Sequence, residues 1–159
     1  MEKEQLPVAL EFLSTMAEAE TAVSGFYSAC LADWPAEDLW KTLAEQELGH
    51  AAAALRIREL VAAAPAEFQV ARLVNIKGVD LFIAGVKSST EKARRKIYSL
   101  KQALAAARDI EQSILESRYD QFFSSGNAEY KALIDGIMAD TRGHKEQINV
   151  RLAYLNLVK

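Results

Sequence analysis

Apolar residues recur every three or four positions along four long stretches of the chain, which is the spacing that predicts amphipathic helices. Trp34-Pro35 separates the first two stretches, because the residue before a proline avoids the helical backbone conformation. A Ser-Ser-Gly-Asn run separates the last two. Because short links make neighbouring helices antiparallel, we expect two helical hairpins. The expected helices span about 7–33, 36–63, 90–123 and 128–157.

Residues 64–89 join the two hairpins and are long enough to cross a bundle. Apolar residues at helical spacing predict that this connector is partly helical, although Gly78 and Gly85 weaken the pattern. A Ser-Ser-Thr-Glu run at 88–91 looks like a capping box that opens the third long helix. With only 3 Pro and 7 Gly, the sequence predicts one all-α domain over 1–159, a four-helix bundle with a long crossover.

The overall composition narrows the function classes. Half of the residues are apolar, 26% are charged and the formal charge is −3, which is typical of a globular protein and gives no reason to expect nucleic acid as a partner. The basic cluster at 92–96 reads as a solvated face, with a docking patch as the alternative. Cys30 is the one cysteine, and neither a signal segment nor an apolar run of about 18 residues stands out. We therefore expect a cytoplasmic protein outside the membrane.

Three glutamates interrupt the apolar stripes that should face the core. A buried carboxylate is costly unless it is paired, protonated or bound to a metal, so Glu20, Glu47 and Glu111 require an explanation. Any one of them alone is better read as a boundary residue. Measured from the tips of the two hairpins, however, all three lie at a similar depth, roughly 20 Å along their helices at 1.5 Å per residue. The shared depth favours a common site.

The two histidines of the chain strengthen this interpretation. His50 follows Glu47 by three residues, and His144 follows Thr141 by three, so each pair shares one helical face. A lone inward histidine is usually a satisfied core residue, whereas two histidines at equivalent places point to a site. Carboxylates and imidazoles converging at the centre of a bundle suit iron or manganese, and they would also accept zinc.

Four segments together resemble the rubrerythrin-like branch of the ferritin-like superfamily, and the resemblance covers nearly the whole chain. Members of that family carry a Glu on the first and third helices and Glu-x-x-His on the second and fourth. The chain has no CxxC pair for a rubredoxin domain. The segments that carry the resemblance are Ala-Glu-Thr-Ala-Val-Ser-Gly-Phe-Tyr at 19–27, Leu-Ala-Glu-Gln-Glu-Leu-Gly-His-Ala at 43–51, Ala-Arg-Asp-Ile-Glu at 107–111 and Asp-Thr-Arg-Gly-His at 140–144.

The resemblance implies a ferritin-like fold and a ligand set for two iron ions. Glu20 and His50 would bind one ion, Glu111 and His144 the other, and Glu47 would bridge them. Tyr27 would lie near the ions as a hydrogen-bond or redox neighbour. The alternative for Tyr27 is a core aromatic residue with its hydroxyl at the boundary.

The chain departs from the family pattern on the fourth helix. Thr141 stands where the family has a second bridging glutamate, and Asp140 is the nearest residue that could replace it. Asp140 is one methylene shorter than glutamate and is turned about 100° from Thr141 around the helix. This departure weakens the prediction of a full dinuclear site, and the alternatives are weaker binding at one position, a single metal ion, or a site altered for another task.

The resemblance implies a nonhaem diiron redox protein that reacts with peroxide or dioxygen and takes electrons from an external donor. It also implies that the protein forms a homodimer. The alternatives are a metal-binding or storage protein without turnover, a bundle that has lost its chemistry, and an enzyme that oxygenates an organic substrate. Aromatic residues at the bundle end could contact a second subunit, but we favour a role in closing the bundle's own core. They are Trp34, Trp40, Phe122 and Phe123.

Overall fold

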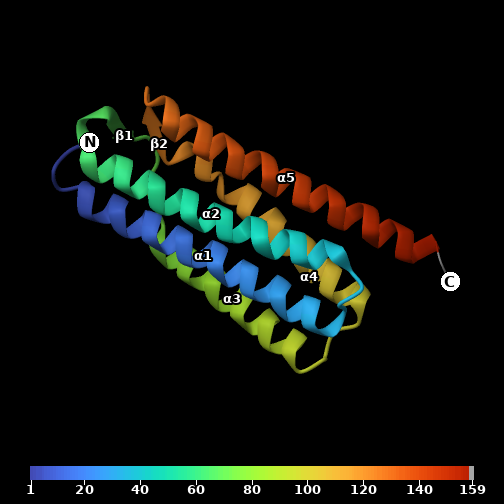
Figure 1. Cartoon of the computed structure of the whole chain (residues 1–159). Coiled ribbons are helices and arrows are strands. Elements are labelled where there is room, and N and C mark those ends of the chain that lie inside the picture. Colours follow the sequence, from blue (N-terminus) through green and yellow to red (C-terminus); the bar gives the residue numbers. More distant parts are fainter. Residues whose placement is uncertain (158–159) are drawn as a thin grey trace.

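The computed structural model describes residues 1–157 and shows a bundle of helices with one small two-stranded sheet (Figure 1). The predicted all-helical bundle is thereby confirmed. The helices are α1 (Leu6–Asp33), α2 (Asp38–Ala63), α3 (Ile76–Arg94), α4 (Leu100–Ser117) and α5 (Ala128–Leu157). The strands are β1 (Phe68–Val70) and β2 (Phe123–Ser125), and the 3₁₀ turns are η1 (Pro65–Glu67) and η2 (Tyr119–Gln121).

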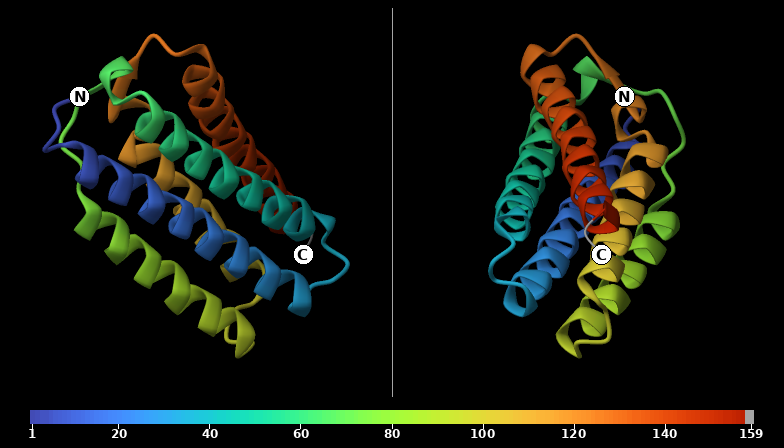
Figure 2. Two further views of the ribbon diagram at one scale, coloured as in Figure 1. Left: turned by 60° about the vertical axis from the view of Figure 1, so that its left-hand side comes forward. Right: turned by 90° about the vertical axis from the view of Figure 1, so that its right-hand side faces the viewer.

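The helices pack as two hairpins with an additional helix on the outside. α1 packs along α2, α4 packs along α5, and α2 also packs against α5, while α3 lies along α1 (Figures 1 and 2). Helices α1, α2, α4 and α5 enclose a core of large apolar side chains, each worth about 1.5–3 kcal/mol when fully buried. The largest of these side chains are Trp40, Tyr27, Phe12, Phe26, Phe68, Leu13 and Met16.

The expected third helix is wrong in its bounds. Instead of one helix over 90–123, the chain forms α3 and α4 with a break between them. Lys96 lies in the left-handed region, with φ of 55°, which ends helical backbone. Ser99 then caps α4 in a capping box with Gln102. The Ser-Ser-Thr-Glu run at 88–91, which looked like a cap, lies inside α3, where Thr90 Oγ1 donates to the Val86 carbonyl oxygen.

The basic cluster at 92–96 consequently lies at the C-terminal end of α3 and not at a helix start. Lys92 and Arg94 stand in the last turn, where positive charge interacts favourably with the helix dipole. Lys96 forms an ion pair with Asp33 at the end of α1, with 3.0 Å between Nζ and Oδ1. Lys96 therefore links the end of α3 to the end of α1, while Arg94 pairs with Glu91 within α3.

Replacing Ser99 with Ala is expected to destabilise the protein by about 1 kcal/mol, the usual cost of losing a helix N-cap. Ser99 Oγ accepts a hydrogen bond from Gln102 N at 3.3 Å, and Gln102 Oε1 accepts one from Ser99 N at 2.8 Å. Urea unfolding followed by circular dichroism measures the change. Ser113→Ala, in the middle of α4, is the control and should shift stability by less than about 0.5 kcal/mol. Equal effects of the two variants would contradict the capping role.

The strands β1 and β2 close one end of the bundle. They pair antiparallel, with Phe68 opposite Ser125 and Val70 opposite Phe123. Phe122 and Phe123 were expected in a helix, but they lie in and beside β2 and pack against Phe12, with ring centroids 4.4 and 6.4 Å apart. These rings, like Trp40, are buried in the chain's own core, as we favoured for the aromatic residues, whereas Trp34 is only partly buried.

Within residues 1–157, no helix is both long enough and apolar enough to cross a membrane.

Candidate metal centre

The four helices of the bundle each direct polar side chains into one place in the core. All of these side chains are buried, and they interrupt rows of apolar neighbours that pack above and below them. The structure thus brings together the five residues on which the sequence prediction centred. They are Glu20 from α1, Glu47 and His50 from α2, Glu111 from α4, and His144 from α5.

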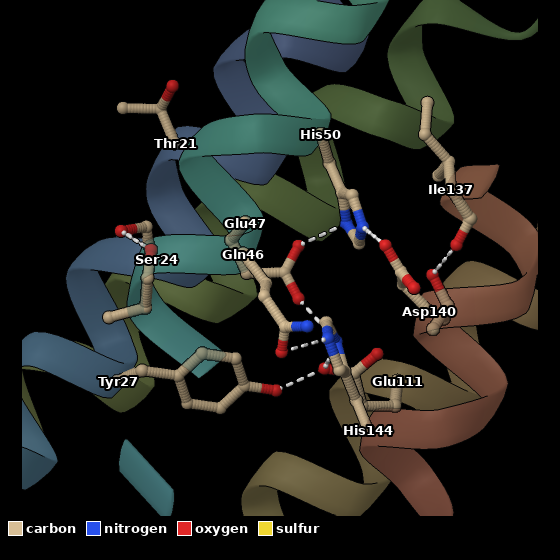
Figure 3. A network of polar contacts seen from close by, with 12 residues as sticks. Thr21, Ser24, Tyr27, Gln46, Glu47, His50, Glu111, Ile137, Asp140 and His144 are labelled. Atoms are coloured by element: carbon tan, nitrogen blue, oxygen red, sulfur yellow. Dashed lines mark hydrogen bonds and ion pairs between the residues drawn. The ribbon is translucent and has the colours of Figure 1, made fainter. Parts of the chain in front are cut away.

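The five side chains form two overlapping groups that meet at Glu47. Glu20, Glu47 and His50 make the first, and Glu47, Glu111 and His144 make the second; within each group the potential ligand atoms lie within 4.8 Å of one another. Glu47 Oε2 lies 3.0 Å from His50 Nδ1, and Glu47 Oε1 lies 2.9 Å from His144 Nδ1 (Figure 3). The two oxygens of one carboxylate therefore face the two imidazoles, as a bridging ligand requires.

The outer nitrogens of both histidines also have partners. His50 Nε2 lies 3.3 Å from Asp140 Oδ2, and His144 Nε2 lies 3.1 Å from Gln46 Oε1 (Figure 3). Asp140 had been considered as a replacement for a missing ligand, but the structure places it behind His50 and outside both groups. Gln46 was not anticipated from the sequence, because nothing in the pattern of α2 marks it as a neighbour of a residue on α5.

Thr141 contributes no ligand in this structure. Its side chain is buried, and its hydroxyl donates to the carbonyl oxygen of Ile137 in the preceding turn of α5, with an Oγ1–O distance of 2.8 Å. His144 is therefore the one residue of α5 in the two groups. The described residues supply three carboxylates and two imidazoles to the centre.

Tyr27 lies beside the centre and contacts one of its carboxylates. Its hydroxyl donates a hydrogen bond to Glu111 Oε1 (Figure 3). Its ring stacks on Trp40 with the centroids 5.9 Å apart. Both aromatic side chains are fully buried. Tyr27 therefore fixes the position of one ligand carboxylate and occupies one of its oxygens.

Several polar atoms at the centre are buried without a hydrogen-bond partner among the described residues. They include both oxygens of Glu20, one oxygen each of Glu47 and Glu111, and Nδ1 of His144, whose approach to Glu47 has no hydrogen-bond geometry. A buried polar group without a partner costs about 1–3 kcal/mol, and more when it is charged. Five such atoms converging on one place are those that a pair of cations would satisfy, so the residues present fit a dinuclear metal site.

In the metal-free protein the pKa values of the three glutamates at the centre are shifted in different directions. Burial raises the pKa of Glu20 well above its usual value, and the nearby Glu47 charge raises it further. Burial likewise raises the pKa of Glu111. Burial also acts to raise the pKa of Glu47, but its close contacts with His144 and His50 outweigh burial and lower this pKa to about 2.

The histidines respond in the opposite sense. Burial alone would lower the pKa of His144, but its contacts with Glu111 and Glu47 outweigh burial and raise the pKa to about 9. The pKa of His50 is also raised, because Glu47 and Asp140 outweigh burial. In the absence of metal these pKa shifts favour an ionised Glu47 and protonated forms of the two histidines, whose ring centroids lie 5.4 Å apart.

No protein-family model matches the chain, and neither does any curated protein or solved structure.

Proposed function

We propose that this chain is a ferritin-like metal-binding protein whose bundle core holds two ions, with Glu47 as the bridging ligand. The observation that carries the proposal is the position of Glu47, whose two oxygens face two histidines while each histidine has a further carboxylate beside it. Carboxylates at the centre of a helical bundle, with histidines one turn away, are the usual ligands of di-iron and di-manganese proteins.

Iron is the first metal to test, with manganese and zinc as the alternatives that the same ligands accept. Three carboxylates offset most of the charge of two divalent ions, and each imidazole adds a neutral nitrogen. A di-iron centre bound here would supply electrons to peroxide or dioxygen and recover them from an external donor. The chain's own part is to exclude bulk water, hold the ligands in place and keep a proton on Tyr27, whose hydroxyl donates to Glu111.

Metal content tests the proposal most directly. Protein purified without added metal, and then reloaded anaerobically with Fe²⁺ and desalted, is expected to retain about two ions per chain. Mass spectrometry with inductively coupled plasma gives the number. A value near one would reduce the site to a mononuclear centre, and a value near zero for iron, manganese and zinc alike would contradict the proposal.

Redox turnover is tested separately from binding. The ferrous protein is mixed with hydrogen peroxide or with dissolved oxygen, and oxidation of the iron is followed by near-ultraviolet absorption. We propose reaction with one of these oxidants, in a protein that works as a homodimer. Oxidation no faster than that of free Fe²⁺ would leave metal binding in place and remove the redox activity.

A second function, metal binding or storage without turnover, has one observation in its favour. The hydroxyl of Thr141 is hydrogen-bonded to its own helix, so α5 provides no second bridging carboxylate and the pair of ions would have one anionic ligand fewer than the family pattern offers. Two bound ions that do not react with either oxidant would favour this alternative. Size-exclusion chromatography distinguishes a dimer from the larger assembly expected of a storage protein.

A further inference from the structure

The two histidines are held from behind by a reciprocal pair of contacts between α2 and α5. His50 lies on α2 and its Nε2 meets Asp140 of α5, whereas His144 lies on α5 and its Nε2 meets Gln46 of α2 (Figure 3). In each helix the polar residue precedes the histidine by one turn, which places both side chains on the same face. Each helix thus provides a histidine and the group that supports the histidine of the other helix.

Such contacts decide which nitrogen of an imidazole is available to a metal. An acceptor behind Nε2 keeps the proton on that nitrogen and leaves the lone pair of Nδ1 directed at the centre. In both histidines Nδ1 is the atom that faces Glu47. Asp140 and Gln46 therefore select the same orientation for the two rings, although neither belongs to the groups of ligand atoms.

The two supporting groups differ in charge. Asp140 offers His50 a carboxylate, and Gln46 offers His144 a neutral amide oxygen. A hydrogen bond to an ionised acceptor is roughly twice as strong as one between neutral groups, and it makes the imidazole a better donor to a metal. His50 is consequently the stronger of the two nitrogen ligands.

The carboxylates are unequal in the same direction. Both oxygens of Glu20 are free of hydrogen bonds, whereas one oxygen of Glu111 accepts the hydroxyl of Tyr27. Glu20 therefore offers two oxygens without a hydrogen bond to a cation at the first position, whereas Glu111 offers one at the second. Both differences favour a cation at the first position.

We infer that the two metal positions fill in order, first at Glu20, Glu47 and His50, and that Asp140 and Gln46 are the positioning residues that set this order. The inference rests on the proposed dinuclear site and adds to it which position fills first and why. It also gives Asp140 a role other than that of a substitute ligand for the residue missing at Thr141.

Zn²⁺ titration of the metal-free protein by isothermal calorimetry tests the order with two isosteric variants. The unaltered chain is expected to bind in two steps of different affinity. Asp140→Asn should weaken the first step by about 10–100-fold, the usual effect of altering a group behind a metal-bound histidine. Gln46→Glu should strengthen the second step and bring the two affinities closer together. Comparable affinity changes in the control variants Asp135→Asn and Gln147→Glu, exposed on α5, would mean that net charge alone is responsible and would overturn the inference.

Nuclear magnetic resonance of ¹⁵N-histidine-labelled protein shows which position fills. Since the chain has only two histidines, each gives a distinct set of ring signals, assigned by His144→Gln. At one equivalent of Zn²⁺ the His50 signals are expected to shift to the Nδ1-bound, Nε2-protonated pattern while those of His144 stay in place. Simultaneous shifts, His144 shifting first, or an Nε2-bound pattern would overturn the inference and leave the dinuclear site standing. Absence of any Zn²⁺ binding would instead remove the proposed function together with it.

Discussion

Replacing Glu47 with Gln is expected to remove both metal ions, whereas replacing Glu20 or Glu111 removes one. Glu47 is the residue common to the two groups of ligand atoms, and its oxygens lie 3.0 and 2.9 Å from the two histidine nitrogens. Gln keeps the shape of the side chain but loses its negative charge, so two cations would lie close together without the anion between them. The number of ions per chain, measured after equilibration with a fixed concentration of free Zn²⁺, separates the variants.

The pattern of losses matters more than any single loss. If Glu47→Gln and Glu20→Gln each removed one ion, Glu47 would be a terminal ligand and the bridging role would be wrong. Glu45→Gln, on the exposed face of α2, changes the charge by the same amount without entering either group and should retain both ions.

Glu47→Gln and Glu20→Gln should also differ in the free energy of unfolding of the metal-free protein. Glu47 is a buried anion between two imidazoles, and removing one partner of a buried ion pair costs about 3–5 kcal/mol. Glu20→Gln should cost much less, because burial raises the pKa of Glu20 and so favours the neutral form, which Gln resembles. Urea unfolding in the presence of a chelator measures both free energies of unfolding, and equal costs would contradict an ionised Glu47 in the metal-free state.

The convergence of the five side chains could be anticipated because each lies on an apolar stripe whose period is fixed by helix geometry. Glu20 and Glu47 flank the short Trp34-Pro35 link, so their depths follow from counting along two straight helices. The same count is less accurate for the second hairpin, because α4 already ends at Ser117 and a 3₁₀ turn and a strand separate it from α5. Counting residues from the tip of the second hairpin nevertheless places Glu111 beside the correct turn of α5, where His144 Nδ1 lies 3.5 Å from Glu111 Oε1.

The position of the break between α3 and α4 could not be predicted from the local sequence. The runs at 88–91 and 99–102 both have the capping-box pattern, and only the second is used. Lys96 takes a left-handed conformation that no glycine signals. The pairing of β1 with β2 and the contact of Gln46 with His144 both join residues far apart in the sequence. They depend on how the elements pack in three dimensions, which the periodicity of a single helix does not predict.

Metal should stabilise the protein most strongly at alkaline pH. The pKa of His144 is raised to about 9, so the stability that its protonated form contributes is complete below its usual pKa near 6.5 and is lost as the pH rises through 9. The raised pKa values of Glu20 and Glu111 act in the same direction, because their neutral forms are favoured in the fold and ionisation becomes costly as the pH rises. The metal-free protein is therefore expected to lose stability between pH 6.5 and 9.

Bound ions reverse this dependence because they take the place of the protons. Each ion present at 100 times its dissociation constant adds about 2.7 kcal/mol to the free energy of unfolding, so two ions add about 5 kcal/mol. Since metal and protons compete for the same imidazoles and carboxylates, the affinity and the stabilisation both rise from pH 6 to pH 9 at constant free Zn²⁺. Thermal unfolding at pH 6, 7.5 and 9, with chelator or with buffered Zn²⁺, measures the difference. A stabilisation by Zn²⁺ that did not grow with pH would show that the ions bind outside this proton-holding cluster, and Glu47→Gln should abolish the growth if they bind within it.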